Sequence, residues 1–368
     1  MTESRSGPIT RPGPPLAGVR VLDLATLYPA PLLAAMLGDF GADVVKVEAA
    51  DGDPLRRVGA LDVTGTAVAW RVAARNKRSV VADPPTAAAL AAVADVVIVN
   101  QPAAVLVRNR WDATSVISAN PRVVYVSLTA FGATGPYADR PGNGSIAEAF
   151  GGFAHLNGAA GGPPVLPSLA LGDTLAAIAG VAPIIAALFA RDTGRGSGAR
   201  LDLSMYEPIL DLQAAAIAAW QPGDDPPTRR GSRIAAAAPR NVYECADSSW
   251  IAVSGPTDEQ VTRLLTLMGR PDDVARWGRA AQRREGEADA LDAAVADWVH
   301  ARSRDNVLAQ LLEARIPAAA VNSIADLAVD PQVQARASLD HALGVTLRPA
   351  PEIGQHTDEV LTEWLGEI

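Results

Sequence analysis

Cysteine is almost absent from this chain. Among its 368 residues the only thiol is that of Cys245. A single thiol excludes an intramolecular disulfide and any metal site built from several thiolates. We therefore expect a cytoplasmic location and no metal site.

An excess of positive charge is also absent. The chain has 32 Lys and Arg against 41 Asp and Glu, which gives a net charge of −9. This balance argues against a surface that binds polyanions, so we expect no nucleic-acid partner. It does not exclude a local cationic pocket for a phosphorylated ligand.

No apolar run is long enough to predict a membrane span. The longest, residues 175–190, is rich in Ala and Gly, contains Pro183 and falls short of the roughly 20 residues that a bilayer requires. We expect a buried helix there and no membrane partner. Residues 1–14 hold charges, Gly and three prolines but no apolar segment typical of a signal peptide, which predicts a disordered lead.

A strand, a helix and a second strand follow one another at the start of the chain. An apolar run at residues 19–24 precedes helical apolar spacing at 31–40 and a β-branched run at 43–48. The alternation continues with a helix at 86–94, a strand at 96–99, a helix through 105–119 and a strand at 123–127. It predicts a doubly wound, Rossmann-like parallel sheet. The Gly-x-Gly-x-x-Gly fingerprint does not follow the first strand, so a nicotinamide cofactor is not supported.

A second domain is expected because the chain is long for one simple domain. Residues 221–233, rich in Pro, Gly and Arg, have the composition of a linker. Beyond this linker we expect a hairpin with its turn at residues 247–249. Helices are predicted at residues 258–268, 286–299 and 306–314.

Six segments occur in an order that resembles the class III coenzyme A transferases, the family of formyl-CoA transferase, carnitine CoA-transferase and α-methylacyl-CoA racemase. They read PLAGVRVLDLATLYPAPLLAAMLGDFGADVVKVEAADGDPLRR, ARNKRSVVADPP, DVVIVNQPAAVLVR, NPRVVYVSLTAFGATGPYADRPG, TGRGSGARLDLSMYE and QHTDEVL. The resemblance covers nearly the whole chain, and no single motif carries it.

The resemblance implies an α/β fold with a Rossmann-like large domain and a smaller α+β domain. It implies that two chains interlock like linked rings, as a homodimer. The first part of the large domain is expected at residues 15–220, the small domain at 234–317, and the return to the large domain at 318–368.

Asp173 follows a glycine at the head of a helix of small residues, in PSLALGDTLAAIAGVAPIIAAL. On the residues alone it is interpreted as a helix N-cap, where the helix dipole favours the ionised carboxylate. The resemblance implies more, because Leu-Gly-Asp looks like the catalytic aspartate motif of the family, with Asp173 as nucleophile. Candidate donors for an oxyanion hole are the backbone N–H groups of Gly151, Gly152, Gly161 and Gly162, which are otherwise plain turn glycines.

Coenzyme A or acyl-CoA is implied as a substrate, with no permanently bound cofactor. Arg108 is the expected phosphate ligand. Further CoA contacts are expected from Tyr28, Ala82, Asp83, Asn100, Gln101, Gly142 and Asn143. Nearby cations, which are either additional phosphate ligands or solvated surface charges, are Arg75, Lys77 and Arg78. The chain departs from the polar or cationic pattern of the family at Ala49, Pro85 and Pro102.

The leading interpretation is an acyl-CoA:carboxylate CoA-transferase that exchanges CoA between two carboxylic acids through an aspartyl-CoA thioester. A racemase or epimerase of 2-methylacyl-CoA is the weaker alternative. That branch usually has a histidine in a Gly-His-Asp segment, where this chain has Gly142, Asn143 and Gly144. Asn143 cannot exchange a proton at neutral pH, and the nearest histidine is His155. The missing cationic contacts also leave open a non-catalytic or altered-ligand paralogue.

Overall fold

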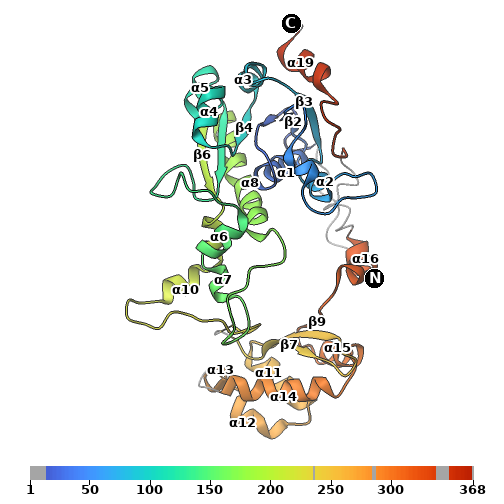
Figure 1. Ribbon diagram of the computed structural model, residues 1–368. Helices are drawn as coiled ribbons and strands as arrows, with labels where there is room; N and C mark the ends of the chain where they lie inside the picture. Colours follow the sequence, from blue (N-terminus) through green and yellow to red (C-terminus); the bar gives the residue numbers. More distant parts are fainter. Residues whose placement is uncertain (1–13, 235–236, 284–286, 337–347, 367–368) are drawn as a thin grey trace. The chain divides into compact units, whose positions relative to one another are not determined.

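The computed structural model describes residues 14–234, 237–283, 287–336 and 348–366 (Figure 1). The lead expected at residues 1–14 lies outside this part of the chain except for Pro14. Two compact units are present. The larger comprises Met1–Ala154, Leu166–Asp225 and Ala337–Ile368, and the smaller comprises His155–Val165 and Pro226–Arg336.

The larger unit contains a six-stranded parallel sheet in the order β3-β2-β1-β4-β5-β6. Its strands are β1 (Arg20–Asp23), β2 (Asp43–Glu48), β3 (Lys77–Val81), β4 (Val96–Val99), β5 (Val124–Thr129) and β6 (Ala199–Ser204). Leu22 of β1 lies opposite Val45 of β2 on one side and Val97 of β4 on the other. The order confirms the doubly wound sheet, and the strand order reverses between β1 and β4.

Helices cover both faces of this sheet (Figure 1). The helices of this unit are α1 (Pro29–Asp39), η1 (Pro54–Arg57), α2 (Val68–Ala73), α3 (Pro84–Val93), α4 (Ala103–Asn109), α5 (Ala113–Ala119), α6 (Gly144–Phe150), α8 (Leu171–Asp192), α9 (Glu207–Leu212), α10 (Ala214–Ala219) and α19 (Thr357–Leu365). Successive residues of β1 face opposite sides, as a strand requires. Val21 joins the core under α1 and α8, and Leu22 joins the core under α3, α5 and α19.

The single helix predicted over residues 105–119 is wrong, because the chain forms α4 and α5 there. Arg110 ends α4 in the left-handed conformation, with φ 61°. Asp112 then begins α5 by accepting a hydrogen bond from the N–H of Ser115 at 3.1 Å. A left-handed residue followed by a new N-cap interrupts the helical backbone, whereas the apolar spacing continues across the break.

Helix α8 is longer and more exposed than the sequence predicted. It has 22 residues and is apolar enough, by length and composition, to cross a membrane, yet only 28% of its most apolar window is buried. It packs against α1, α6, α9, β5 and β6. One side of α8 is thus covered by the larger unit, whereas Ile178 and Phe189 are exposed, so the helix expected to be buried is only partly buried.

The smaller unit is built on an antiparallel sheet in the order β7-β8-β9. Its elements are α7 (Phe153–Leu156), which begins in the larger unit, then β7 (Arg240–Glu244), β8 (Trp250–Ser254), α11 (Asp258–Leu267), η2 (Pro271–Asp273), α12 (Val274–Trp277), α13 (Ala280–Gln282), α14 (Ala288–His300), α15 (Arg304–Glu313), β9 (Ala318–Ala320), α16 (Ile324–Val329) and α17 (Pro331–Ala335). The predicted hairpin is confirmed as β7 and β8. Because β9 pairs with β8, the smaller unit continues past residue 317.

The C-terminal segment returns to the larger unit beside β3. The N–H of His356 donates to the carbonyl oxygen of Ser79 at 2.9 Å. The N–H of Val81 donates to the hydroxyl of Thr357 at 3.1 Å. These bonds join α19 to the edge of the sheet.

Candidate active site

The loop after β1 lies where the strand order reverses, the position at which doubly wound proteins bind ligands. Asn100, which follows β4, shapes this loop: its Oδ1 accepts from the N–H of Thr26 at 2.9 Å, and its Nδ2 donates to the Thr26 carbonyl at 2.7 Å. Gln101 donates to the carbonyl of Leu24 and accepts from the N–H of Asn100. We expected both side chains to contact CoA, but their amide groups are engaged in holding the loop.

The same loop brings Tyr28 to the start of α8. Its hydroxyl lies near the side chain of Thr174. Burial raises the pKa of Tyr28, the Thr174 side chain lowers it, and the neighbouring carboxylate of Asp173 raises it. The net pKa lies above the ordinary value for tyrosine. Tyr28 is therefore a neighbour of the expected nucleophile.

Asp173 is the third residue of α8 and does not cap it. The helix begins at Leu171, and Ala170 occupies the N-cap position without a side-chain hydrogen bond, so the N-cap interpretation is wrong. The half-buried carboxylate lies against the backbone of Gly144. A Cβ atom on Gly144 would lie 2.4 Å from Oδ2 of Asp173. Only glycine leaves room for this contact.

The electrostatic surroundings of Asp173 differ from those the sequence suggested. Burial raises the pKa of Asp173, the Gly144 N–H lowers it, and the Glu148 carboxylate raises it again; the net pKa is above that of an ordinary aspartate. We expected the helix dipole to favour the ionised form. In the described part of the chain no Lys, Arg or His forms an ion pair with Asp173. Burial therefore has the largest effect on the pKa of Asp173, and the net shift is upward.

Glu148 on α6 is a residue that the sequence analysis missed. Its side chain is 2% exposed. Oε1 accepts from the N–H of Gly172 at 2.8 Å, and Oε2 is buried without a hydrogen-bond partner among the described residues. Glu148 lies four residues after Gly144, on the same face of α6. This spacing from Gly144 is the feature of the sequence from which Glu148 could have been placed near the site.

The start of α6 holds two further expected site residues. Oδ1 of Asn143 accepts from the N–H of Ile146 at 3.2 Å, which makes Asn143 the N-cap of α6. Gly142 packs closely on Ala130, since a Cβ atom there would lie 2.5 Å from the Cβ of Ala130. Tyr28, Asn143 and Asp173 are thus near one another. Of the other expected CoA contacts, Ala82 and Asp83 follow β3, and Asn100 and Gln101 follow β4.

Arg108 on α4 is exposed, and among the described residues it has no hydrogen bond or ion pair. It is available for a phosphate group. Asp83 is the N-cap of α3 and accepts from the N–H of Thr86 at 2.9 Å. Ala82 is half-buried just after β3.

The cations expected beside Arg108 are not available. Lys77 is fully buried, and its Nζ donates to Oδ2 of Asp23 and to the Pro31 carbonyl, each at 2.7 Å. Two further side chains form ion pairs within the unit: Arg75 with Asp39, and Arg78 with Asp43, Glu359 and Glu363. These three cations are buried, so both expectations for them, phosphate ligands and solvated charges, are wrong.

The glycine pairs are turn residues. The N–H of Gly151 donates to the Ala147 carbonyl at 2.7 Å, and that of Gly152 donates to Ala149 at 3.3 Å. In the smaller unit the N–H of Gly162 donates to Ala159 at 3.0 Å. These bonds do not support an oxyanion role for Gly151, Gly152 or Gly162. His155, also in the smaller unit, has Nε2 at 3.2 Å from the Pro227 carbonyl.

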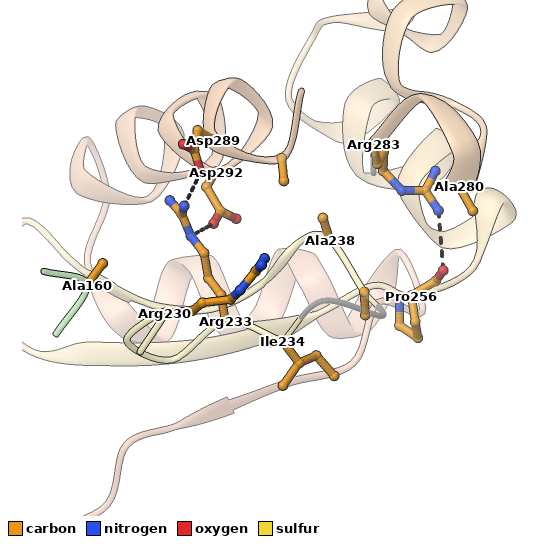
Figure 2. Close-up of a pocket in the computed structure, with 12 residues that line it drawn as sticks. Ala160, Arg230, Arg233, Ile234, Ala238, Pro256, Ala280, Arg283, Asp289 and Asp292 are labelled. Atoms are coloured by element: carbon orange, nitrogen blue, oxygen red, sulfur yellow. Dashed lines mark hydrogen bonds and ion pairs between the residues drawn. The ribbon is translucent and has the colours of Figure 1, made fainter. Parts of the chain in front are cut away.

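A cavity of about 210 Å³ lies in the smaller unit. Figure 2 shows Arg233 pointing toward Asp289 and Asp292, with which it forms ion pairs. Arg283 pairs with Asp258 at 2.9 Å. Two of the three arginines that line the cavity, Arg233 and Arg283, are thus engaged in ion pairs, and we assign no ligand to this cavity.

Comparison with known proteins identifies the family. The chain matches the sequence model of CoA-transferase family III over residues 16–357. It is 36% identical to the succinyl-CoA–L-malate CoA-transferase beta subunit of Chloroflexus aurantiacus, over 96% of this chain and 94% of that relative. It is 32% identical to the succinate–glutarate CoA-transferase of Agrobacterium fabrum, over 95% and 96%. The crystal structure of a CAIB/BAIF family protein from Brucella suis matches with a TM-score of 0.82 and 27% identity, over 96% of this chain and 100% of that one. The chain therefore belongs to CoA-transferase family III, and it is an enzyme whose substrates are CoA thioesters and carboxylates.

Proposed function

We propose that the enzyme transfers CoA from an acyl-CoA to a second carboxylic acid through a thioester on Asp173. The observation that carries this proposal is the Asp173 carboxylate, which is half-buried, sits against the Gly144 N–H and has no cationic partner among the described residues. A carboxylate removed from water and not neutralised by a cation is a reactive nucleophile toward a thioester.

In the first half of the reaction, a carboxylate oxygen of Asp173 attacks the acyl carbonyl carbon of the donor. The carbon–sulfur bond breaks, CoA leaves as its thiolate, and a mixed anhydride remains on the enzyme. The thiolate then attacks the aspartyl carbonyl of this anhydride. The donor acid leaves as a carboxylate, and Asp173 carries CoA as a thioester.

The second half reverses these steps with the acceptor acid. The acceptor carboxylate attacks the aspartyl thioester and expels the CoA thiolate, which forms a second anhydride. The thiolate attacks the acceptor carbonyl of that anhydride, releases the new acyl-CoA and restores the Asp173 carboxylate. No net proton or electron transfer is required.

We propose small dicarboxylic acids as the acids exchanged, with succinyl-CoA as a donor. Support comes from the names of relatives that align over nearly the whole chain, in which succinyl-CoA or succinate is paired with malate, citramalate or glutarate. Arg108 is our proposed phosphate ligand for CoA, with Tyr28 and Asn143 close to the acyl end.

We also propose that the enzyme is a homodimer of interlocked chains located in the cytoplasm. Apolar side chains exposed on α8, α9 and α10 support a second copy, because a face of this kind is typical of a subunit interface. These side chains are Ile178, Phe189, Leu212 and Ile217. Light scattering in solution measures the assembly directly, and a monomer at micromolar concentration contradicts it.

The alternatives receive no specific support. Asn143 caps α6 through its amide oxygen and has no proton to exchange at neutral pH, so a racemase lacks a base at this position. Whole-chain relatives named as CoA-transferases argue against a non-catalytic paralogue. Incorporation of deuterium at Cα of a 2-methylacyl-CoA tests the racemase directly.

Intact-protein mass spectrometry tests the proposed function. Incubation with succinyl-CoA gives a covalent CoA adduct, and hydroxylamine converts it to a hydroxamate on Asp173. The variant Asp173→Asn gives no adduct and loses at least about 10³-fold in kcat, since the nucleophile is gone. Asp192→Asn, at the other end of α8, is the matched control. It should still form the CoA adduct and keep its kcat. Full turnover in well-folded Asp173→Asn protein contradicts the mechanism.

A further inference from the structure

Glu148 is the buried carboxylate that the proposed reaction does not use. It projects from α6 against the start of α8, and its side chain is 2% exposed. Oε1 accepts the N–H of Gly172, the residue immediately before Asp173, at 2.8 Å. Oε2 is buried and has no hydrogen-bond partner among the described residues.

Burying a carboxylate oxygen without a hydrogen-bond donor or a cation destabilises the folded protein, because no new interaction replaces the lost hydration. A purely structural bond to Gly172 needs only one neutral acceptor, which a glutamine would supply. A carboxylate in place of an amide at this position therefore points to a use for its charge. Asp173 is a reactive group close to it, with which it interacts electrostatically.

Close packing makes this interaction specific. A Cβ atom on Gly172 would lie 2.7 Å from the carbonyl oxygen of Gly144, so the first turns of α6 and α8 are in direct backbone contact. Gly144 also lies against the Asp173 carboxylate. Glu148, on the same helix as Gly144, accepts the N–H of Gly172 at the start of α8.

We propose that Glu148 is a positioning residue for the nucleophile: one oxygen accepts the Gly172 N–H and fixes the first turn of α8, and the other places an uncompensated charge beside the Asp173 carboxylate. This inference rests on the proposed function of Asp173. It is supported by the pKa of Asp173, which burial raises and the charge of Glu148 raises further. A more basic carboxylate attacks the thioester faster, provided that it remains ionised at the working pH.

Other charged groups near α8 are accounted for. The titratable and charged side chains on elements packed against it are Tyr28 at the N-cap of α1 and Asp39 on α1, Tyr125 on β5, Arg200 and Asp202 on β6, and Glu207 and Asp211 on α9. Asp39 is paired with Arg75, and Glu207 accepts from the hydroxyl of Ser204. Among the charged groups, Glu148 is the one that shifts the pKa of Asp173 in the described part of the chain, and Asp173 in turn raises the pKa of Tyr28.

The variant Glu148→Gln separates charge from shape, because an amide oxygen still accepts the Gly172 N–H. Two changes are expected in the pH profile of adduct formation, measured by quenched mass spectrometry. The acid limb moves to lower pH, since the pKa of Asp173 falls when the Glu148 charge is removed. The plateau rate falls roughly 10-fold, because the nucleophile is less basic. KM for succinyl-CoA and the melting temperature stay close to those of the unmodified protein.

Two further variants complete the test. Glu207→Gln removes a carboxylate from another helix packed on α8 and is expected to leave the pH profile unchanged. Glu148→Ala is expected to lower the melting temperature, since the Gly172 N–H loses its acceptor. If Glu148→Gln leaves both the acid limb and the plateau unchanged, Glu148 is only structural and the inference is overturned. An active Asp173→Asn protein instead overturns the proposed function itself, so the two failures are distinguishable.

Discussion

Two groups of buried charges in the larger unit are built in opposite ways. Near the carboxyl ends of β1 and β2, Lys77 pairs with Asp23 at 2.7 Å, and Lys46 pairs with Asp53 at 3.2 Å. At the start of α8, Asp173 and Glu148 lie close together without a cation among the described residues. Paired buried charges hold the backbone in place, whereas uncompensated ones cost stability and are typical of reactive sites.

The paired group explains why cations counted from the sequence were misassigned. Lys77 is fully buried, and desolvation lowers its pKa to about 8 although Asp23 raises it. Glu48 accepts from Arg56 at 2.7 Å; burial alone would raise the pKa of Glu48, but the bonds from Arg56 and Ser79 leave it lowered. These charges are engaged in the fold, and few remain for a phosphorylated ligand.

The largest effect is expected from a variant that breaks one of the paired buried charges. Lys77→Met leaves the Asp23 carboxylate buried and unpaired, so the free energy of unfolding should fall by about 3–5 kcal/mol. Urea denaturation measures this change. The double variant Lys77→Met with Asp23→Leu should recover most of the loss. Arg57→Ala removes an exposed partner of Asp51 and is the matched control, with an effect of about 0–1 kcal/mol. Equal effects of the buried and exposed changes contradict the comparison.

The next effect concerns Arg108, an exposed cation without an ion pair among the described residues. Arg108→Ala should raise KM for CoA thioesters roughly 10-fold and change kcat little, because a remote phosphate contact binds ground state and transition state alike. Steady-state kinetics with succinyl-CoA measures both constants. Arg122→Ala, another exposed arginine of the larger unit, is the control. A loss confined to kcat is inconsistent with a phosphate ligand.

A smaller effect is expected from adding a cation. Ala49 is exposed just after β2, where the family resemblance implies an arginine. Ala49→Arg should tighten CoA binding several-fold and make it more salt-sensitive, since a guanidinium can form charge-assisted bonds with phosphate. Calorimetry at two salt concentrations measures this. The neighbouring Ala50→Arg controls for net charge, and equal gains from both variants argue against a pocket at this edge.

The smallest expected effect is a gain in stability. The pKa of Asp173 is raised in the folded protein, so its ionisation destabilises the fold as pH rises through that pKa. Asp173→Asn removes this cost and should raise the melting temperature slightly at neutral pH. The gain should disappear at a pH below the ordinary aspartate pKa of about 3.9, where Asp173 is neutral in both the folded and the unfolded protein. Calorimetric scans across this range test the sign, and a lower melting temperature at neutral pH contradicts it.

The sequence alone predicted much of the larger unit. The bounds of β2 and β4 were predicted to the residue, because short β-branched and apolar runs bounded by polar or turn residues are local signals. Asp173 is proposed as the nucleophile from a motif and from the order of its flanking segments. The family resemblance, carried by those segments, is confirmed over nearly the whole chain.

Only the tertiary structure decided which charges are compensated. Asp23 and Lys77 are 54 residues apart and meet because their strands lie in one sheet on either side of β2. Glu148 and Gly172 are 24 residues apart and meet because α6 packs on α8. Local sequence determines helices, strands and caps, since those depend on near neighbours. The partner of a buried charge, and with it the pKa of Asp173, depends on contacts between distant segments that exist only once the chain has folded.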